Sequence, residues 1–377
     1  MGSKGIGESA VTPTKVGKVQ RKSAQPVVSV TAEKCAIISG GPDTTASTVV
    51  TGPEITARVT AQEGPSIVTG PETTGRVTAQ EGPSISTGQE TTATAGVRAQ
   101  EGPRIITGPE TTARVRAQEG PSIVTGPETT ARVTAQEGPS IVTGQETPAT
   151  AGVTAQEGPS IVTGQETTAT AGVTAQEGPS IVTGQETTAT AGVTAQEGPS
   201  IVTGSGTTAR VTAQEGPSIV TGPETTARVT AQEGPSIFTG QETPATARVT
   251  AQEGPSIVTG QETPATAGVT AQEGPSIVTG QETTTTAGVT AQEGPSIVTG
   301  PETTARVTAQ EGPSIITGQE TPATAGVTAQ EGPSIVTGQE TTAGVTAQEG
   351  PSIVTGPETT AGVTAQEGPG CHSPAGQ

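Results

Sequence analysis

The ten residues from Ala61 to Gly70 read Ala-Gln-Glu-Gly-Pro-Ser-Ile-Val-Thr-Gly, and this stretch organises the rest of the chain. It returns with few changes until a last copy that begins at Ala365 and breaks off at Gly370. Successive copies follow one another at two spacings, an 18-residue one, as from Ala117 to Ala135, and a 20-residue one, as from Ala135 to Ala155. Tandem copying at such a short period indicates one repeated structural unit rather than several separate cores.

The copies divide the chain into four segments. Residues 1–38 form a basic, non-repeated head, and residues 39–60 read as a degenerate repeat. The tandem 18- or 20-residue repeats occupy residues 61–369, and residues 370–377 form a C-terminal tail. The sequence therefore predicts a single repeat array with short flanking segments.

The composition argues against a conventional globular core. Only 29% of the residues are hydrophobic, and Phe238 is the single aromatic residue of the 377. Large apolar and aromatic side chains supply most of the area that a compact domain buries. The net charge is −19, yet every lysine lies at or before Lys34, so a basic head precedes an acidic array. An acidic array is a poor surface for nucleic acid, because phosphate contacts need cations.

The second half of each unit carries the pattern of a strand. In the 18-residue unit from Ala117, the residues Ala131, Val133 and Ala135 alternate with polar residues, which is typical of a half-buried strand. The 20-residue units add two residues to this part. An insertion of two keeps every side chain on its own face of a strand, whereas it would turn a helical face by ~200°.

A second apolar piece lies between the two Gly-Pro pairs of the 18-residue unit. It reads Ser-Ile-Val-Thr, as at residues 122–125. The isoleucine is kept in the complete copies, while the next residue is Val124, Ser86, Ile106 or Phe238. This pattern predicts that the isoleucine faces inward and its variable neighbour faces outward.

Two fold classes fit these observations. The preferred one is a low-complexity tandem-repeat chain that is mostly disordered or extended, since it is rich in Pro, Gly, Thr, Glu and Gln and poor in aromatic residues. The alternative is an all-β repeat rod, similar to a β-solenoid, with one coil per 18- or 20-residue unit. In that alternative, ladder hydrogen bonds would have to offset the entropy of ordering each coil, and glutamates stacked on glutamates along the array would repel one another.

The residue types give little support for a catalytic or metal site. The single histidine, His372, lies beside Cys371 in the tail, with no scaffold to orient a nucleophile. The sequence therefore predicts no enzyme activity, no catalytic or metal-binding residues and no cofactor. The head carries a possible basic interaction patch, formed by Lys15, Lys18, Arg21 and Lys22.

The function that this sequence predicts is that of a non-enzymatic extended spacer or multivalent interaction array with unknown protein partners. No small-molecule substrate is expected. Three alternatives stay open: a Thr-rich, mucin-like surface or secreted stalk, a structural β-solenoid, and a minisatellite-derived product without a selected activity. The sequence shows no signal peptide and no apolar run of ~20 residues, so a cytoplasmic or nuclear location is favoured over secretion, and no membrane span is expected.

Overall fold

The computed structural model describes most of the chain. The described residues are 19–20, 27–31, 35–39, 47–52, 54–70, 72–88, 93–144, 150–164, 170–184, 188–240, 246–260, 265–280, 285–318, 323–367 and 370–374. The patch residues Lys15, Lys18, Arg21 and Lys22 lie outside these ranges. The chain forms two compact units, Met1–Gln185 and Glu186–Gln377, which share one architecture and are described separately.

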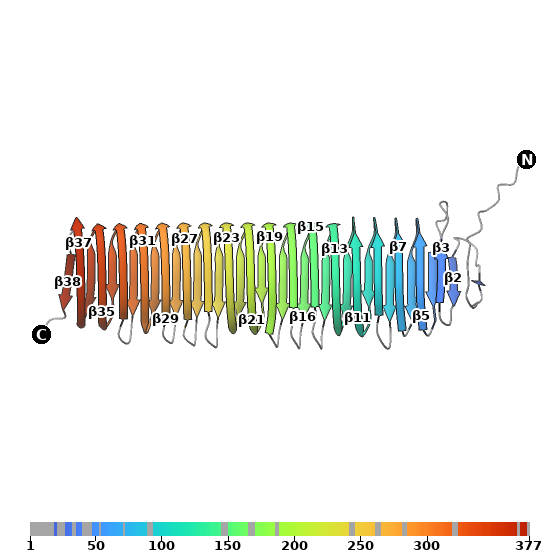
Figure 1. Ribbon diagram of the computed structural model, residues 1–377, viewed down its shortest axis with the longest axis horizontal. Coiled ribbons are helices and arrows are strands. Elements are labelled where there is room, and N and C mark those ends of the chain that lie inside the picture. Colours follow the sequence, from blue (N-terminus) through green and yellow to red (C-terminus); the bar gives the residue numbers. More distant parts are fainter. Residues whose placement is uncertain are drawn as a thin grey trace, which may run out of the picture. The chain divides into compact units, whose positions relative to one another are not determined.

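Each unit is an all-β parallel β-solenoid, with one coil per 18- or 20-residue repeat. Every regular element among the described residues is a strand. Each coil contributes a long strand to sheet A and a short strand to sheet B, and from β2 onward the two kinds of strand alternate along each unit (Figure 1). The pairs within both sheets are parallel, except that β1 pairs antiparallel with β2.

In the first unit, the sheet A strands are β3 (Cys35–Ser39), β5 (Glu54–Ala61), β7 (Glu72–Ala79), β9 (Ala93–Ala99), β11 (Glu110–Ala117), β13 (Glu128–Glu137), β15 (Thr150–Glu157) and β17 (Thr170–Glu177). The sheet B strands there are β1 (Val19–Gln20), β2 (Val27–Thr31), β4 (Ser47–Thr51), β6 (Ser66–Gly70), β8 (Ser84–Gly88), β10 (Arg104–Thr107), β12 (Ser122–Gly126), β14 (Ser140–Gly144), β16 (Ser160–Gly164) and β18 (Ser180–Gly184).

In the second unit, the sheet A strands are β19 (Thr188–Glu197), β21 (Gly206–Glu215), β23 (Glu224–Glu233), β25 (Thr246–Glu253), β27 (Ala265–Glu273), β29 (Thr285–Glu293), β31 (Thr303–Glu311), β33 (Ala323–Glu331), β35 (Glu340–Glu349) and β37 (Glu358–Glu367). The sheet B strands there are β20 (Ser200–Thr203), β22 (Ser218–Gly222), β24 (Ser236–Gly240), β26 (Ser256–Gly260), β28 (Ser276–Gly280), β30 (Ser296–Gly300), β32 (Ser314–Gly318), β34 (Ser334–Thr337), β36 (Ser352–Gly356) and β38 (Gly370–Pro374).

Sheet A confirms the predicted alternation. In β13, Ala131, Val133 and Ala135 are buried, whereas Arg132 is exposed. Val133 of this 18-residue coil pairs with Val153 of the following 20-residue coil. The two additional residues of the longer coil thus leave the buried set in register, as an even insertion must in a strand.

Sheet B corrects the predicted facing of the isoleucines. In β12, Ser122 and Val124 are buried, whereas Ile123 and Thr125 are only half-buried. The residue after the corner Pro121 faces the interior and is small, so the period-2 geometry turns the isoleucine outward and the variable neighbour inward. Phe238 is accordingly fully buried, between Val220 and Val258 of the adjacent coils.

The corner between the two sheets requires glycine. Gly138 has a φ of 102°, a region that L side chains rarely adopt. A Cβ built there would lie 2.9 Å from the carbonyl oxygen of Gly120 in the preceding coil. The peptide NH of Gly138 donates to the carbonyl oxygen of Glu157 in the following coil at 3.2 Å. The same glycine therefore serves both the turn and the close stacking of the coils.

The ordered coils do not support the expectation of a mostly disordered chain, and they confirm the alternative β-solenoid. The backbone of each coil bonds to the coils on both sides, in both sheets and at the corners. Ser122, for example, donates its peptide NH to the carbonyl oxygen of Pro139 at 2.9 Å. Buried backbone groups are thereby paired, which removes the main cost of a core with few large side chains.

Candidate functional site

A run of arginines marks the outer face of sheet A in the first unit. Because alternate residues of β5, β7, β9, β11 and β13 point away from the interior, their polar side chains gather on one surface. Six arginines on these strands are exposed, and we call them the arginine face: Arg58, Arg76, Arg98, Arg114, Arg116 and Arg132.

The register between the coils arranges the arginine face in two adjacent rows. In the first row Arg58 pairs with Arg76, and Arg114 pairs with Arg132, with Gly96 in the coil between the two pairs. In the second row Arg98 pairs with Arg116. Neighbouring strands lie ~4.8 Å apart, so each arginine of the first row has another one coil away, and only one glycine coil interrupts the row.

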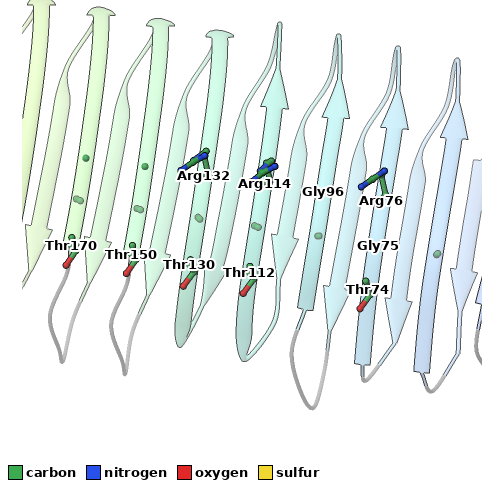
Figure 2. Close-up of a pocket in the computed structure, with 18 of the residues that line it drawn as sticks. Thr74, Gly75, Arg76, Gly96, Thr112, Arg114, Thr130, Arg132, Thr150 and Thr170 are labelled. Carbon is green, nitrogen blue, oxygen red and sulfur yellow. The ribbon is translucent and has the colours of Figure 1, made fainter.

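A shallow groove of about 1050 Å³ runs along the first row. Exposed threonines form one side of it, including Thr112 and Thr130. The first arginine row forms the other side, and buried alanines such as Ala113 form the floor. Figure 2 shows the labelled threonines in one row and the labelled arginines in the next. The groove continues over β15 and β17, where Gly152 and Gly172 take the arginine position.

No ion pair involves the arginine face among the described residues. Acidic residues do border it, as Glu128 and Glu137 do at the two ends of β13. Arg132 lies four residues from the first and five from the second, or about 13 Å and 16 Å along an extended strand. Both glutamates are exposed. The arginine face is therefore a narrow cationic strip between two acidic margins.

The second unit carries a sparser version of the same surface. Arg210, Arg228 and Arg248 occupy successive coils in register. Two glycine coils then separate Arg248 from Arg306, and a smaller hollow of about 190 Å³ lies there. The same register position thus holds arginine in some coils and glycine in others.

Reasoning from the sequence placed a basic patch in the head and did not find the arginine face. The patch of Lys15, Lys18, Arg21 and Lys22 lies outside the described residues and stays a prediction. The signal for the arginine face was present, because Arg132 alternates with buried residues and equivalent arginines recur in several copies. Only the register of the coils brings those arginines together.

The described part of the chain contains no group of three or more His, Cys, Asp or Glu side chains that could hold a metal ion. No helix in that part is long and apolar enough to cross a membrane. No family model, no curated protein and no solved structure matches this chain. The fold and the geometry of its surfaces are therefore the basis for a functional proposal.

Proposed function

We propose that this protein is a non-enzymatic structural scaffold that binds a partner through many coils at once. The observation that carries this proposal is the register, which aligns equivalent outward positions from coil to coil and repeats the same side chain at several of them. Thr130, for example, pairs with Thr150, which pairs with Thr170, and all three are exposed. A partner that contacts several such positions gains effective concentration at each additional contact, even where one contact is weak.

The same register makes the coils a spacer of adjustable length. Each added coil advances a unit by one strand spacing, ~4.8 Å, and continues the same rows of outward positions. Coils of both lengths serve equally, because both keep the outward positions aligned. The scaffold thus sets both the number of contacts and the distance over which they are offered.

The test is the dependence of partner binding on coil number. We would recover the partner from the native source with the full-length chain and measure its dissociation rate. The same measurement would follow on chains that lack two, four or six whole coils, residues 135–174, 135–212 and 135–250. The proposal expects the dissociation rate to rise with each deletion. A rate that does not depend on coil number would overturn it, provided that circular dichroism shows that the shortened chains stay folded.

A further inference from the structure

We propose that the arginine face binds a linear anionic polysaccharide that lies along the groove, perpendicular to the strands. Its carboxylate or sulfate groups would contact the two arginine rows, and its hydroxyl groups would contact the neighbouring threonine row. This inference rests on the proposed function, since it names the class of partner that one surface of the scaffold takes.

The charge of the surface calls for an anionic ligand. Six exposed guanidinium groups lie within five coils and form no ion pair with the described residues, although the chain carries a net charge of −19. A guanidinium presents a planar set of donors that matches carboxylate, sulfate and phosphate oxygens. In an otherwise acidic protein, this cluster of cations is therefore the surface that attracts a polyanion most strongly.

The width of the strip limits the ligand to a single thin chain. The acidic margins represented by Glu128 and Glu137 lie on both sides of Arg132, at the two ends of β13. A broad polyanion such as a nucleic acid duplex would place some of its phosphates against these carboxylates, which repel them. A single chain in the groove keeps its charges over the arginines.

The spacing of the rows separates a polysaccharide from an acidic peptide. The coils offer contacts every ~4.8 Å along the groove. An extended peptide repeats side chains on one face only every ~6.7 Å, so its carboxylates fall out of step with the coils. A sugar unit in an extended β-linked chain advances by nearly one coil. Each sugar can therefore meet one coil. Because consecutive sugars of such a chain turn their substituents to opposite edges, charges on one edge recur every second coil, as Arg76 and Arg114 do in the first row.

The side chains of the groove also argue against single-stranded nucleic acid. Surfaces that bind single strands stack the bases on exposed aromatic side chains. The single aromatic residue, Phe238, is fully buried and lies in the other unit. The groove instead offers threonine hydroxyls, such as those of Thr112 and Thr130, which match the hydroxyl groups of sugars.

The experiment is a binding titration of the full-length chain with defined probes. Carboxymethyl cellulose supplies carboxylates and cellulose sulfate supplies sulfates on the same β-linked backbone, so the pair identifies which anion is preferred. Hydroxyethyl cellulose, polyglutamate and oligothymidylate are the neutral, peptide and nucleic acid probes. We expect one or both anionic polysaccharides to bind most tightly, and to lose affinity as sodium chloride rises from about 0.02 M to about 0.5 M.

The chain itself supplies the variant that tests the site. Arg58, Arg76, Arg114 and Arg132 change to Gly, and Arg98 and Arg116 change to Thr, which copies residues that already occupy these register positions in other coils. The sixfold variant should lose about tenfold or more in affinity, because it removes six charge contacts. Arg104→Ser is the matched control, since this arginine lies in the same coils but is fully buried. The affinity of this variant for the polysaccharide should not change.

Equal binding of the polysaccharide by the sixfold variant would overturn the inference, and so would tighter binding of polyglutamate or oligothymidylate than of either polysaccharide. Deletion of residues 155–174, which removes one coil without arginine, separates this inference from the proposed function. Polysaccharide affinity should survive that deletion. Failure of every polysaccharide probe, with native-partner binding still dependent on coil number, would reject this inference alone.

Discussion

At the scale of single residues, Arg104 occupies a buried position that holds serine in the neighbouring coils. Its register partners are Ser84 and Ser122, and all three side chains face the interior. The Arg104 Nη1 donates to the carbonyl oxygen of Glu119 at 2.6 Å, while Nε and Nη2 have no partner among the described residues. Burial lowers the pKa of Arg104, which means that the protonated side chain is more stable in the unfolded chain than in the folded one.

We therefore expect Arg104→Ser to raise the free energy of unfolding by about 2 kcal/mol, since a buried charge with unmet hydrogen bonds is removed. Because the folded pKa is lowered yet arginine stays protonated near neutrality, the gain should be the same at about pH 6 and about pH 8. Thermal unfolding followed by circular dichroism measures it. A lower midpoint for the variant would show that the guanidinium stabilises the coil.

The corner glycines permit a matched pair of substitutions. Gly138→Ala places a methyl group against the Gly120 carbonyl and forces a residue with a side chain into a φ of 102°. Gly152→Ala points into open space, with nothing within 4 Å of the added carbon. We expect the first change to destabilise the fold by about 1–3 kcal/mol and the second to alter it by less than about 0.5 kcal/mol. Equal midpoints for the two variants would contradict the role of the corner.

At the scale of elements, the whole coil is the unit that can be removed. Deleting residues 117–134 joins the start of β11 to the end of β13 and leaves Thr112 and Val115 aligned with Thr150 and Val153. Deleting only residues 117–126 removes β12 and leaves the coil without its sheet B strand. In a repeat protein, stability is close to a sum over coils and their nearest-neighbour interfaces.

The whole-coil deletion should therefore shift the thermal midpoint by about 3 °C or less. The shorter deletion should lower the midpoint by clearly more, although it removes fewer residues. Circular dichroism of both variants, compared at equal concentration, provides the measurement. If the shorter deletion proves the milder one, the coil is not the cooperative element.

At the scale of the whole molecule, stacking like charges carries a cost that salt can relieve. Glu137 pairs with Glu157, which pairs with Glu177, and all three are exposed. Raising sodium chloride from about 0.01 M to about 1 M shortens the Debye length from ~30 Å to ~3 Å. The thermal midpoint should rise over this range, and it should rise less when these three glutamates are changed to glutamine. A midpoint that falls with salt would instead assign net stabilisation to the surface charges.

The parts of this structure that the sequence predicted depend on local alternation. The strand that contains Ala131, Val133 and Ala135 could be predicted, because small apolar and polar residues alternate there along the sequence. The facing of Ile123 was wrong, because it depends on where the corner at Pro121 begins the strand and not on which residue varies. Order itself could not be decided, since apolar burial alone does not offset the chain entropy lost in each coil, and the ladder hydrogen bonds between coils have to supply the difference.

The arginine face shows a different limit of sequence reasoning. Arg76 and Arg114 lie in different repeats, two coils apart, and become near neighbours only when coils of both lengths are stacked in register. A charge count along the chain finds an acidic array. Stacking in register places equivalent positions of successive coils side by side, so arginines that are far apart in the sequence form a strip.

The parallel ladders also determine how each unit responds to being pulled. Hydrogen bonds in both sheets run along the stacking direction, so tension along that direction acts on the interfaces between coils in series, and one interface can yield while the others hold. Each released coil supplies about 60 Å of extended chain. We expect a single-molecule force record to show a regular series of small, equal steps, and one large rupture would contradict this. A chain built in this way extends in steps under load and absorbs mechanical work while its remaining coils stay folded.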